Sequence, residues 1–185
     1  LELKKNSSIS KFVTNNKKTL AIRFPRHDVL KNLLKILNYP LAAPSANIST
    51  RLSPVQTSDV VEEFGDKISY ILDGGKSKIG IESTIINLIK KPQILRLGGL
   101  EVSKIEKVLK QKIKINNNPF KKIVPGQSKL HYSPGIPIKM EVIKPLKNQA
   151  YILIKKRNNK SPHYFYISKN NNLIEATKNL YSCLR

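Results

Sequence analysis

Residues 83–109 read STIINLIKKPQILRLGGLEVSKIEKVL, and this stretch predicts how the chain folds. Its first half holds two short apolar runs, 83–88 and 94–97, with the length and composition typical of β-strands. The glycines that follow, at 98 and 99, end the second run, because glycine breaks regular structure and favours turns. Beyond them, apolar side chains recur at helical spacing along one face, at Val102, Ile105, Val108 and Leu109. That spacing predicts an amphipathic helix.

The rest of the chain repeats this mixture of short strands and helices. Further strands are expected at 18–24, 41–43, 68–72, 150–154 and 164–167, and helices at 27–37, 57–64 and 173–184. Strands mixed with helices in this way indicate an α/β (α+β) fold. Residues 113–138 differ, because they are rich in Asn, Pro and Gly. We therefore expect an α/β domain over residues 1–112, an inter-domain linker over 113–138 and the beginning of a second domain over 139–185.

The composition is strongly basic. The chain has 185 residues, with 34 Lys and Arg against 12 Asp and Glu, which gives a formal net charge of +22. Such an excess predicts a polyanionic partner such as nucleic acid. Most of these cations, however, are Lys residues that accompany Asn and Ile, as the codons of an AT-rich genome produce without any selection for binding. We attribute the charge to this bias first and to an RNA-binding surface second.

Several classes of protein are excluded or disfavoured. A single cysteine, Cys183, excludes an internal disulfide framework and a cysteine-based metal site, and fits the reducing cytoplasm. No apolar run approaches the roughly 18 residues of a membrane span. The three histidines, at 27, 131 and 163, are scattered, and the common phosphate-loop, zinc-protease and serine-hydrolase motifs are absent. The sequence therefore predicts a cytoplasmic protein with no membrane segment and no protein-held metal.

Small polar side chains and a few arginines stand at the ends of the predicted strands. They are Thr19, Arg23, Ser45, Asn47, Ser53, Ser83 and Arg96. Open α/β sheets bind ligands beyond their strand ends, and hydroxyls, amides and guanidinium groups are suitable donors for a phosphate or a carboxylate. Thr19 and Arg23 lie four apart in one predicted strand, so they would share a face. Taken singly, each residue is better explained as a turn former, a sheet-edge residue or a surface charge.

Five ordered stretches resemble a known family. They are TLAIRFP at 19–25, YPLAAPSANISTRLSP at 39–54, LDGG at 72–75, GIESTII at 80–86 and ILRLGG at 94–99. Together they resemble the threonylcarbamoyl-AMP synthase family, the YrdC-like group. The stretch PGQSKLHYSPG at 125–135 resembles the linker of the longer, two-domain branch. The resemblance implies a twisted open sheet with flanking helices, then the linker and the start of a Rossmann-like C-terminal domain.

The resemblance also implies an activity. The family is a group of nucleotidyltransferases that make threonylcarbamoyl-AMP from L-threonine, bicarbonate and ATP and release pyrophosphate, with Mg²⁺ expected beside ATP. The product supplies the N6-threonylcarbamoyladenosine modification of tRNA, through tRNA-modifying transferase proteins. By motif, the implied ATP-binding residues are Thr19, Ser45, Ser53, Arg96 and Tyr132. The implied threonine-binding residues are Arg23, Ala43 and Ser83, with Asn47 and His131 supporting the loops. Tyr132 would close over the pocket, or it is a packing anchor between domains.

One family feature is missing from these residues. The family pairs an S-x-N motif, here Ser45-Ala46-Asn47, with an earlier K-x-R motif that binds ATP phosphates, and no K-x-R precedes Thr19. We therefore expect an internal fragment of the two-domain enzyme, lacking the N-terminal part of its first domain and truncated in its second. Such a fragment is not expected to be active alone. The alternatives are a non-catalytic YrdC-like RNA-binding module and an inactive truncated gene product.

Overall fold

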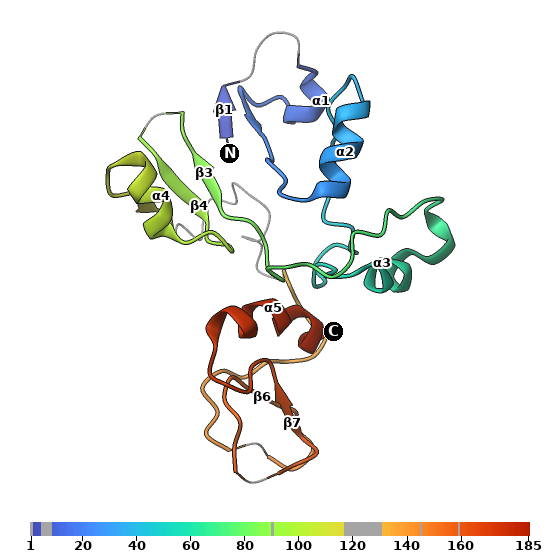
Figure 1. Ribbon diagram of the computed structural model, residues 1–185, viewed down its shortest axis with the longest axis vertical. Coiled ribbons are helices and arrows are strands. Elements are labelled where there is room, and N and C mark those ends of the chain that lie inside the picture. Colours follow the sequence, from blue (N-terminus) through green and yellow to red (C-terminus); the bar gives the residue numbers. More distant parts are fainter. Residues whose placement is uncertain (1, 5–8, 90, 117–130, 145, 159) are drawn as a thin grey trace. The chain divides into compact units, whose positions relative to one another are not determined.

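The computed structural model describes residues 2–4, 9–89, 91–116, 131–144, 146–158 and 160–185. Internal contacts divide the chain into two units, one formed by residues 1–44 and 82–129 and the other by residues 45–81 and 130–185. Each unit thus combines two stretches that lie far apart in the sequence. The labels of Figure 1 identify their helices and strands.

The first unit is built on a five-stranded sheet in the order β2-β1-β3-β4-β5. Its strands are short: β1 (Glu2–Lys4), β2 (Thr19–Ala21), β3 (Ile85–Asn87), β4 (Gln93–Arg96) and β5 (Lys114–Ile115). The sheet is mixed, because β1 pairs antiparallel with β2 and parallel with β3, while β4 pairs antiparallel with β3 and parallel with β5. The predicted α/β (α+β) class is confirmed.

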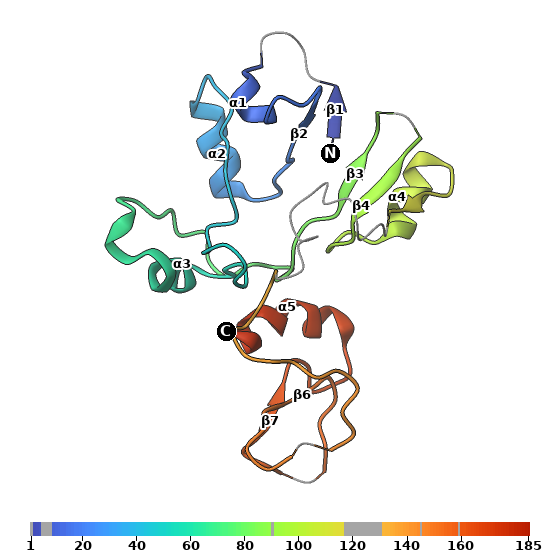
Figure 2. The same ribbon diagram turned by 180° about the vertical axis from the view of Figure 1, so that it is seen from behind.

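Helix α4 (Val102–Leu109) covers the β3–β4 part of this sheet, as Figures 1 and 2 show from opposite sides. Its residue Ile105 is buried with Ile94 and Ile113, and Ile94 has no exposed surface. Burying one such side chain stabilises the fold by about 1.5–3 kcal/mol. Val108 stands at the edge of the apolar stripe and is 81% exposed, so the predicted four-residue stripe buries only part of its length. Helices α1 (Lys11–Thr14) and α2 (Asp28–Ile36) complete the described helices of this unit.

The second unit contains α3 (Thr57–Phe64), the 3₁₀ turn η1 (Gly65–Lys67), β6 (Tyr151–Leu153), β7 (Tyr164–Tyr166) and α5 (Leu173–Leu184). Strands β6 and β7 pair in parallel, with Tyr151 opposite Tyr164. Helix α5 begins at Asn172, whose side-chain oxygen accepts the backbone N–H groups of Ile174 and Glu175 at 2.9 and 3.0 Å. This N-cap satisfies two donors that the first turn leaves unpaired.

Helix α5 also packs on residues that precede the linker in sequence. Tyr181 of α5 is buried with Leu52 and Val55 in one apolar cluster. Gly80 approaches the same helix so closely that a Cβ there would overlap the backbone of Lys178. Its φ of +83° also lies in the left-handed region, which side chains with a Cβ rarely adopt. The glycine of the 80–86 stretch is therefore required by packing and by backbone conformation.

Some expected elements do not form. Residues 41–43 and 68–72 are not strands, and the strand expected at 18–24 shortens to β2. The apolar side chains of 68–72 remain largely in solvent, with Tyr70 92% exposed, because no neighbouring strand pairs with them among the described residues. Strand β1 forms at residues 2–4, where no strand was expected. Within the described ranges, no helix has the length and apolar character needed to cross a membrane.

Candidate functional site

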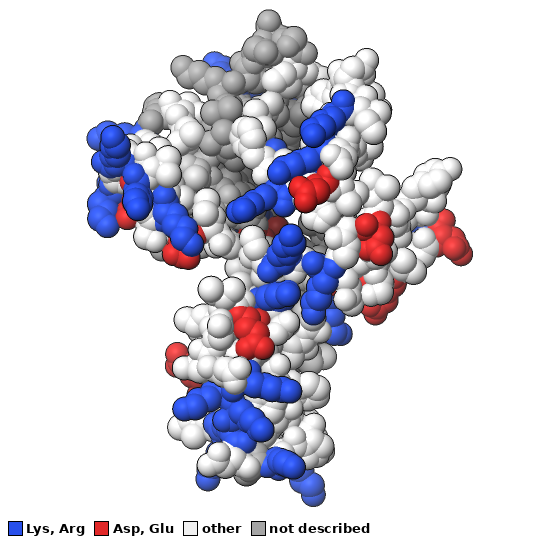
Figure 3. Space-filling view, in the orientation of Figure 1, with Lys and Arg blue, Asp and Glu red and all other residues white. Residues whose placement is uncertain are grey.

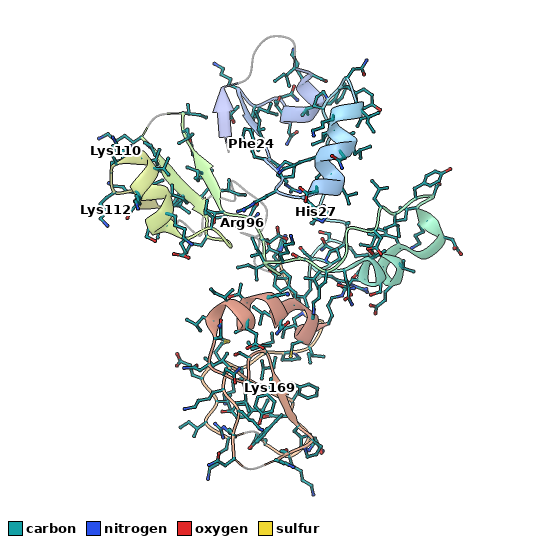
Figure 4. The ribbon with its side chains drawn as sticks, viewed as in Figure 1. Phe24, His27, Arg96, Lys110, Lys112 and Lys169 are labelled. Atoms are coloured by element: carbon teal, nitrogen blue, oxygen red, sulfur yellow. The ribbon has the colours of Figure 1, made fainter. Side chains whose placement is uncertain are left out.

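Arg96 and Ser83, two of the predicted site residues, are in direct contact in the first unit. Arg96 is the last residue of β4, where Figure 4 labels it. Its Nη2 donates to the Ser83 carbonyl oxygen at 3.0 Å and to the Ser83 Oγ at 3.2 Å, and its Nε donates to the same carbonyl at 3.1 Å. The Glu82 carboxylate lies 3.4 Å from Nη2. The guanidinium plane is thus fixed by its neighbours.

Close backbone packing explains why these two motifs meet. A Cβ at Gly98 would overlap the backbone of Glu82, Ser83 and Thr84, so only glycine lets the 94–99 stretch press against the 82–84 stretch. The Gly99 N–H donates to the Glu82 carbonyl at 2.9 Å. The Thr84 hydroxyl donates to the Leu100 carbonyl at 2.9 Å and lies 3.2 Å from the Leu100 N–H. The glycine pair and the S-T pair therefore form one local structure around Arg96.

The chemistry of this cluster suits an anionic ligand. A guanidinium group offers planar, paired N–H donors that match a carboxylate or a phosphate, and a serine hydroxyl both donates and accepts. The Arg96 side chain is 13% exposed and that of Glu82 is 20% exposed, so the charges are partly shielded from water. Interactions between charges strengthen under such shielding. The cluster, which we name the Arg96 cluster (Glu82, Ser83 and Arg96), can orient a small anionic substrate.

The other predicted residues of the first unit occupy different segments. Thr19 is the first residue of β2 and pairs with Lys4 of β1. Arg23 lies beyond the end of β2, so the expectation that it shares one strand face with Thr19 is wrong. Arg23 and Ala43 are exposed, and no hydrogen bond among the described residues joins either of them to Arg96. His27, labelled in Figure 4, is the N-cap residue of α2, at the helix start where the sequence placed it.

The predicted residues of the second unit lie on the 45–55 loop and the end of the linker. Ser45 is exposed, whereas Ser53 is buried between the buried residues Leu52 and Val55. Asn47 shapes the loop, because its Nδ2 donates to the carbonyls of Ile48 and Arg51 at 2.9 and 3.0 Å. Its Oδ1 is buried and has no hydrogen-bond partner within the described part of the chain.

The linker residues His131 and Tyr132 are attached to this loop. The Ser133 N–H donates to the Thr50 carbonyl at 2.9 Å. The Tyr132 ring stacks on Tyr181 of α5, with centroids 5.7 Å apart, and the His131 ring lies 4.1 Å from that of Tyr132. Tyr132 is therefore packed as an anchor in the second unit, and its closure over a pocket stays a prediction. Residues 117–130, which include the start of the predicted linker motif, lie outside the described residues.

Sequence reasoning missed three charged residues of the second unit. Asp59 and Glu63, on α3, are 7% and 9% exposed, and both contact the guanidinium of Arg185 at 3.8 and 3.2 Å. Asp59 was detectable, because Gln56 and Asp59 form a capping box at the start of α3, where Thr57 or Ser58 was expected to be the cap. Arg185 gave no signal, since its partners lie more than 120 positions away in sequence.

An open apolar groove lies beside α4 in the first unit. It has a volume of about 320 Å³ and is lined by Ile86, Leu88, Leu100, Lys104, Ile105, Val108 and Leu109. None of the predicted site residues lines it. Its apolar walls do not suit a phosphate, which needs N–H and O–H donors, so the Arg96 cluster is the better candidate site.

The comparisons with known proteins agree with the family that the motifs resemble. The family model described as "Telomere recombination", for the Sua5, YciO and YrdC proteins, matches residues 1–98. A second model, described as "Threonylcarbamoyl-AMP synthase, C-terminal domain", matches residues 100–185. The chain belongs to the Sua5/YciO/YrdC family, and the second match confirms the resemblance to its two-domain branch.

Similar proteins include the threonylcarbamoyl-AMP synthases of Pyrococcus abyssi, Schizosaccharomyces pombe and Bacillus subtilis. The first is 40% identical over 141 residues, which cover 73% of this chain and 41% of the relative. The second is 41% identical and the third 35% identical, over 70% and 72% of this chain and 34% and 40% of the relatives. The crystal structure of P. abyssi Sua5 complexed with L-threonine matches with a TM-score of 0.79 and 29% identity, over all of this chain and 59% of that one. The chain thus spans about two fifths of the length of the curated relatives it matches.

Proposed function

We propose that the protein is an L-threonylcarbamoyladenylate synthase. The threonine amine takes up the carbon of bicarbonate with loss of water, and the resulting carbamate oxygen attacks the α-phosphorus of ATP, from which pyrophosphate leaves. The observation that carries this proposal is the Arg96 cluster, because it is built from two family motifs and presents anion-binding groups together. The relatives named as threonylcarbamoyl-AMP synthases support the same activity.

We assign the binding roles by motif. Thr19, Ser45, Ser53, Arg96 and Tyr132 are proposed to bind ATP, and Arg23, Ala43 and Ser83 to bind L-threonine. The Arg23 guanidinium suits the threonine carboxylate, and the hydroxyls suit phosphate oxygens. The complex of P. abyssi Sua5 with L-threonine supports an amino-acid site in this family. Asn47 and His131 are proposed to support the loops that carry these residues.

Positioning and exclusion of water are the proposed means of catalysis. Binding both substrates in register removes the entropic cost of their encounter, and a shielded site protects the labile mixed anhydride from hydrolysis. Tyr132 is proposed to contribute by closing over the nucleotide, as active-site segments of other enzymes do. Mg²⁺ is proposed to enter with ATP as part of the substrate. Within the described residues no group of three His, Cys, Asp or Glu side chains is arranged to hold a metal ion by itself.

The domain limits, partners and compartment are proposed on the same grounds. We propose a catalytic domain over 1–112, a linker over 113–138 and a C-terminal domain from 139. The product would pass to the transferase proteins that modify tRNA. The protein is proposed to act in the cytoplasm, with its lone cysteine unpaired. Figure 3 shows Lys and Arg side chains over the α4 region and over the β6–β7 region, the feature that favours RNA binding as the alternative function.

The test is threonine-dependent release of pyrophosphate from ATP by the full-length protein. Arg96→Gln removes the fork that faces Ser83 and should lower kcat/KM roughly 100-fold, the effect of losing a charge-assisted pair of hydrogen bonds. The matched control is Lys91→Gln, which removes one charge from an exposed residue between β3 and β4. Pyrophosphate release that is unaffected by threonine, together with salt-sensitive retention of tRNA on filters, would instead establish the RNA-binding module.

A further inference from the structure

The second unit contains a buried charge network that contacts the 47–55 loop. Its members are Asp59 and Glu63 of α3 and Arg185 at the end of α5, and we name it the Arg185 network. The side chains are 9%, 3% and 13% exposed. Charges so well shielded are costly unless each is paired and hydrogen-bonded. Each member of this network has such partners, and most of those partners belong to the loop that carries Ser53.

Two members hold the backbone on either side of Ser53. The Nη1 group of Arg185 donates to the Leu52 carbonyl at 3.1 Å. The Oδ2 atom of Asp59 accepts the Val55 N–H at 2.8 Å. The residue before Ser53 and the second residue after it are therefore fixed by side chains that also face each other, since Arg185 Nε lies 3.8 Å from Asp59 Oδ1.

Glu63 holds the preceding part of the loop. Its Oε2 atom accepts the Ile48 N–H at 3.3 Å and lies 3.6 Å from the Arg51 guanidinium. Its Oε1 atom accepts from Arg185 Nη2 at 3.2 Å. The loop is thus attached to one network at Ile48, Arg51, Leu52 and Val55. Arg185 bonds directly to Leu52 and acts on the other three positions through Glu63 and Asp59.

Arg185 contributes more than charge. Its Nη2 also donates to the Asp59 carbonyl at 3.3 Å and lies 3.5 Å from the Glu62 carboxylate, which is 76% exposed. Bonds to the Leu52 carbonyl and to a carboxylate from one planar group need the fork of an arginine. A lysine has a single nitrogen at its tip and does not reproduce this planar fork.

From this geometry we infer that Arg185 is a positioning residue for the 47–55 loop. It holds Asp59 and Glu63 so that the 47–55 loop presents Ser53 in one conformation. The inference rests on the proposed function, in which Ser53 binds ATP. It links helix α5, which lies in the part matched by the C-terminal-domain model, to nucleotide binding.

The test compares Arg185→Gln with Lys178→Gln in the full-length protein. Lys178 is exposed on the same helix, so its variant removes an equal charge and leaves the network intact. Arg185→Gln should raise KM for ATP about tenfold, the cost of one charge-assisted hydrogen bond, and should leave kcat and KM for L-threonine within about twofold. Lys178→Gln should match the wild type. Equal increases in both KM values, or no increase for ATP, would overturn the inference.

Two further measurements make the outcome decisive. Asp59→Asn should by itself cause most of the increase in KM for ATP. Adding Arg185→Gln to that variant should therefore raise KM for ATP by less than about a further twofold. Additive increases from the two substitutions would contradict a shared network. If Arg185→Gln does not fold, Arg185→Lys replaces it, with an expected increase of about threefold confined to ATP. A change shared with threonine would count against the inference.

Equilibrium dialysis with ATP separates this inference from the proposed function. If the wild-type protein binds ATP but releases no pyrophosphate with threonine, the proposed function fails. The Arg185→Gln protein should still bind ATP about tenfold more weakly than the wild type in that case. Equal ATP affinity in the two proteins would overturn the role of Arg185 whatever the reaction.

Discussion

Arg96 and Arg185 are equally shielded from water, with 13% of each side chain exposed, yet their contacts differ in kind. Arg96 contacts Ser83 and Glu82, which lie 13 and 14 positions away on the stretch that precedes β3. Arg185 contacts Leu52, Asp59 and Glu63, which lie 122 to 133 positions away. The first cluster is built from local sequence motifs, and the second depends on long-range folding.

The charge around each arginine separates their roles. Arg185 lies among three carboxylates, those of Asp59, Glu62 and Glu63, so its positive charge is used within the protein. Arg96 is bound by a carbonyl, a hydroxyl and the Glu82 carboxylate, at a strand end where ligands bind in open sheets. We therefore regard the Arg96 cluster as the candidate ligand site of the first unit, and the Arg185 network as a support of the 47–55 loop in the second unit.

The largest effect is expected from Gly80→Ala, which disturbs the packing of helix α5, the helix that places Arg185 in its network. The new Cβ would overlap the Lys178 backbone, and alanine is unfavourable at a φ of +83°. We expect a loss of about 3 kcal/mol or more in the free energy of unfolding, measured by urea denaturation of the full-length protein. Because α5 must shift, KM for ATP should rise as in Arg185→Gln. Gly75→Ala is the control, since it also has a positive φ but a Cβ there meets no atom. If the Gly80→Ala protein were no less stable than the Gly75→Ala protein, the close packing of Gly80 on Lys178 would be refuted.

A smaller effect is expected from Gly98→Ala, which disturbs the packing around the Arg96 cluster. The overlap with the backbone of Glu82 and Ser83 is similar, but Gly98 does not have the positive φ of Gly80. We expect a loss of about 2 kcal/mol in the free energy of unfolding by the same method. Displacement of Ser83 from Arg96 should raise KM for both ATP and L-threonine. An increase in KM for ATP alone would contradict the different roles that we assign to Arg96 and Arg185.

These two glycines also show how far the sequence was informative. The stretches that contain Gly80 and Gly98 were identified as motifs, and the strand, turn and helix around Gly98 follow from short-range apolar patterns. Their packing against Lys178 and against the 82–84 backbone depends on which segments meet in space. Local patterns do not contain that information, so Ser83 and Arg96 were singled out from their motifs, whereas their contact with each other, Glu82, and the residues Arg185, Asp59 and Glu63 were not predicted.

The failed strands have a related cause. Residues 41–43 and 68–72 have the composition of strands, but a strand needs a hydrogen-bonded neighbour, and none pairs with them among the described residues. Conversely, β1 has three residues and little pattern, yet it pairs on both sides as the second strand of its sheet. Partner availability, which depends on the whole chain, decided these cases against local propensity.

The smallest effect concerns Asp73, which attaches α3 to the 72–75 stretch from the exposed side. The pKa of Asp73 is lowered because its carboxylate accepts hydrogen bonds from the Thr57 hydroxyl, at 2.5 Å, and from the Gly75 N–H, at 2.8 Å. A lowered folded pKa means that these bonds stabilise the protein fully above the ordinary pKa of an aspartate. The stabilisation is lost as the pH falls through the lowered value.

Asp73→Asn should therefore be less stable than the wild type at pH 7, and the difference should shrink towards pH 3. Urea denaturation at the two pH values measures it, with Asp66→Asn as the control, because Asp66 is an exposed aspartate of η1 for which the described structure gives no side-chain hydrogen bond. Asp73 is exposed, so water competes for its carboxylate and the effect should be smaller than that of either glycine variant. A difference that is constant with pH would mean that the charge of Asp73 does not hold α3.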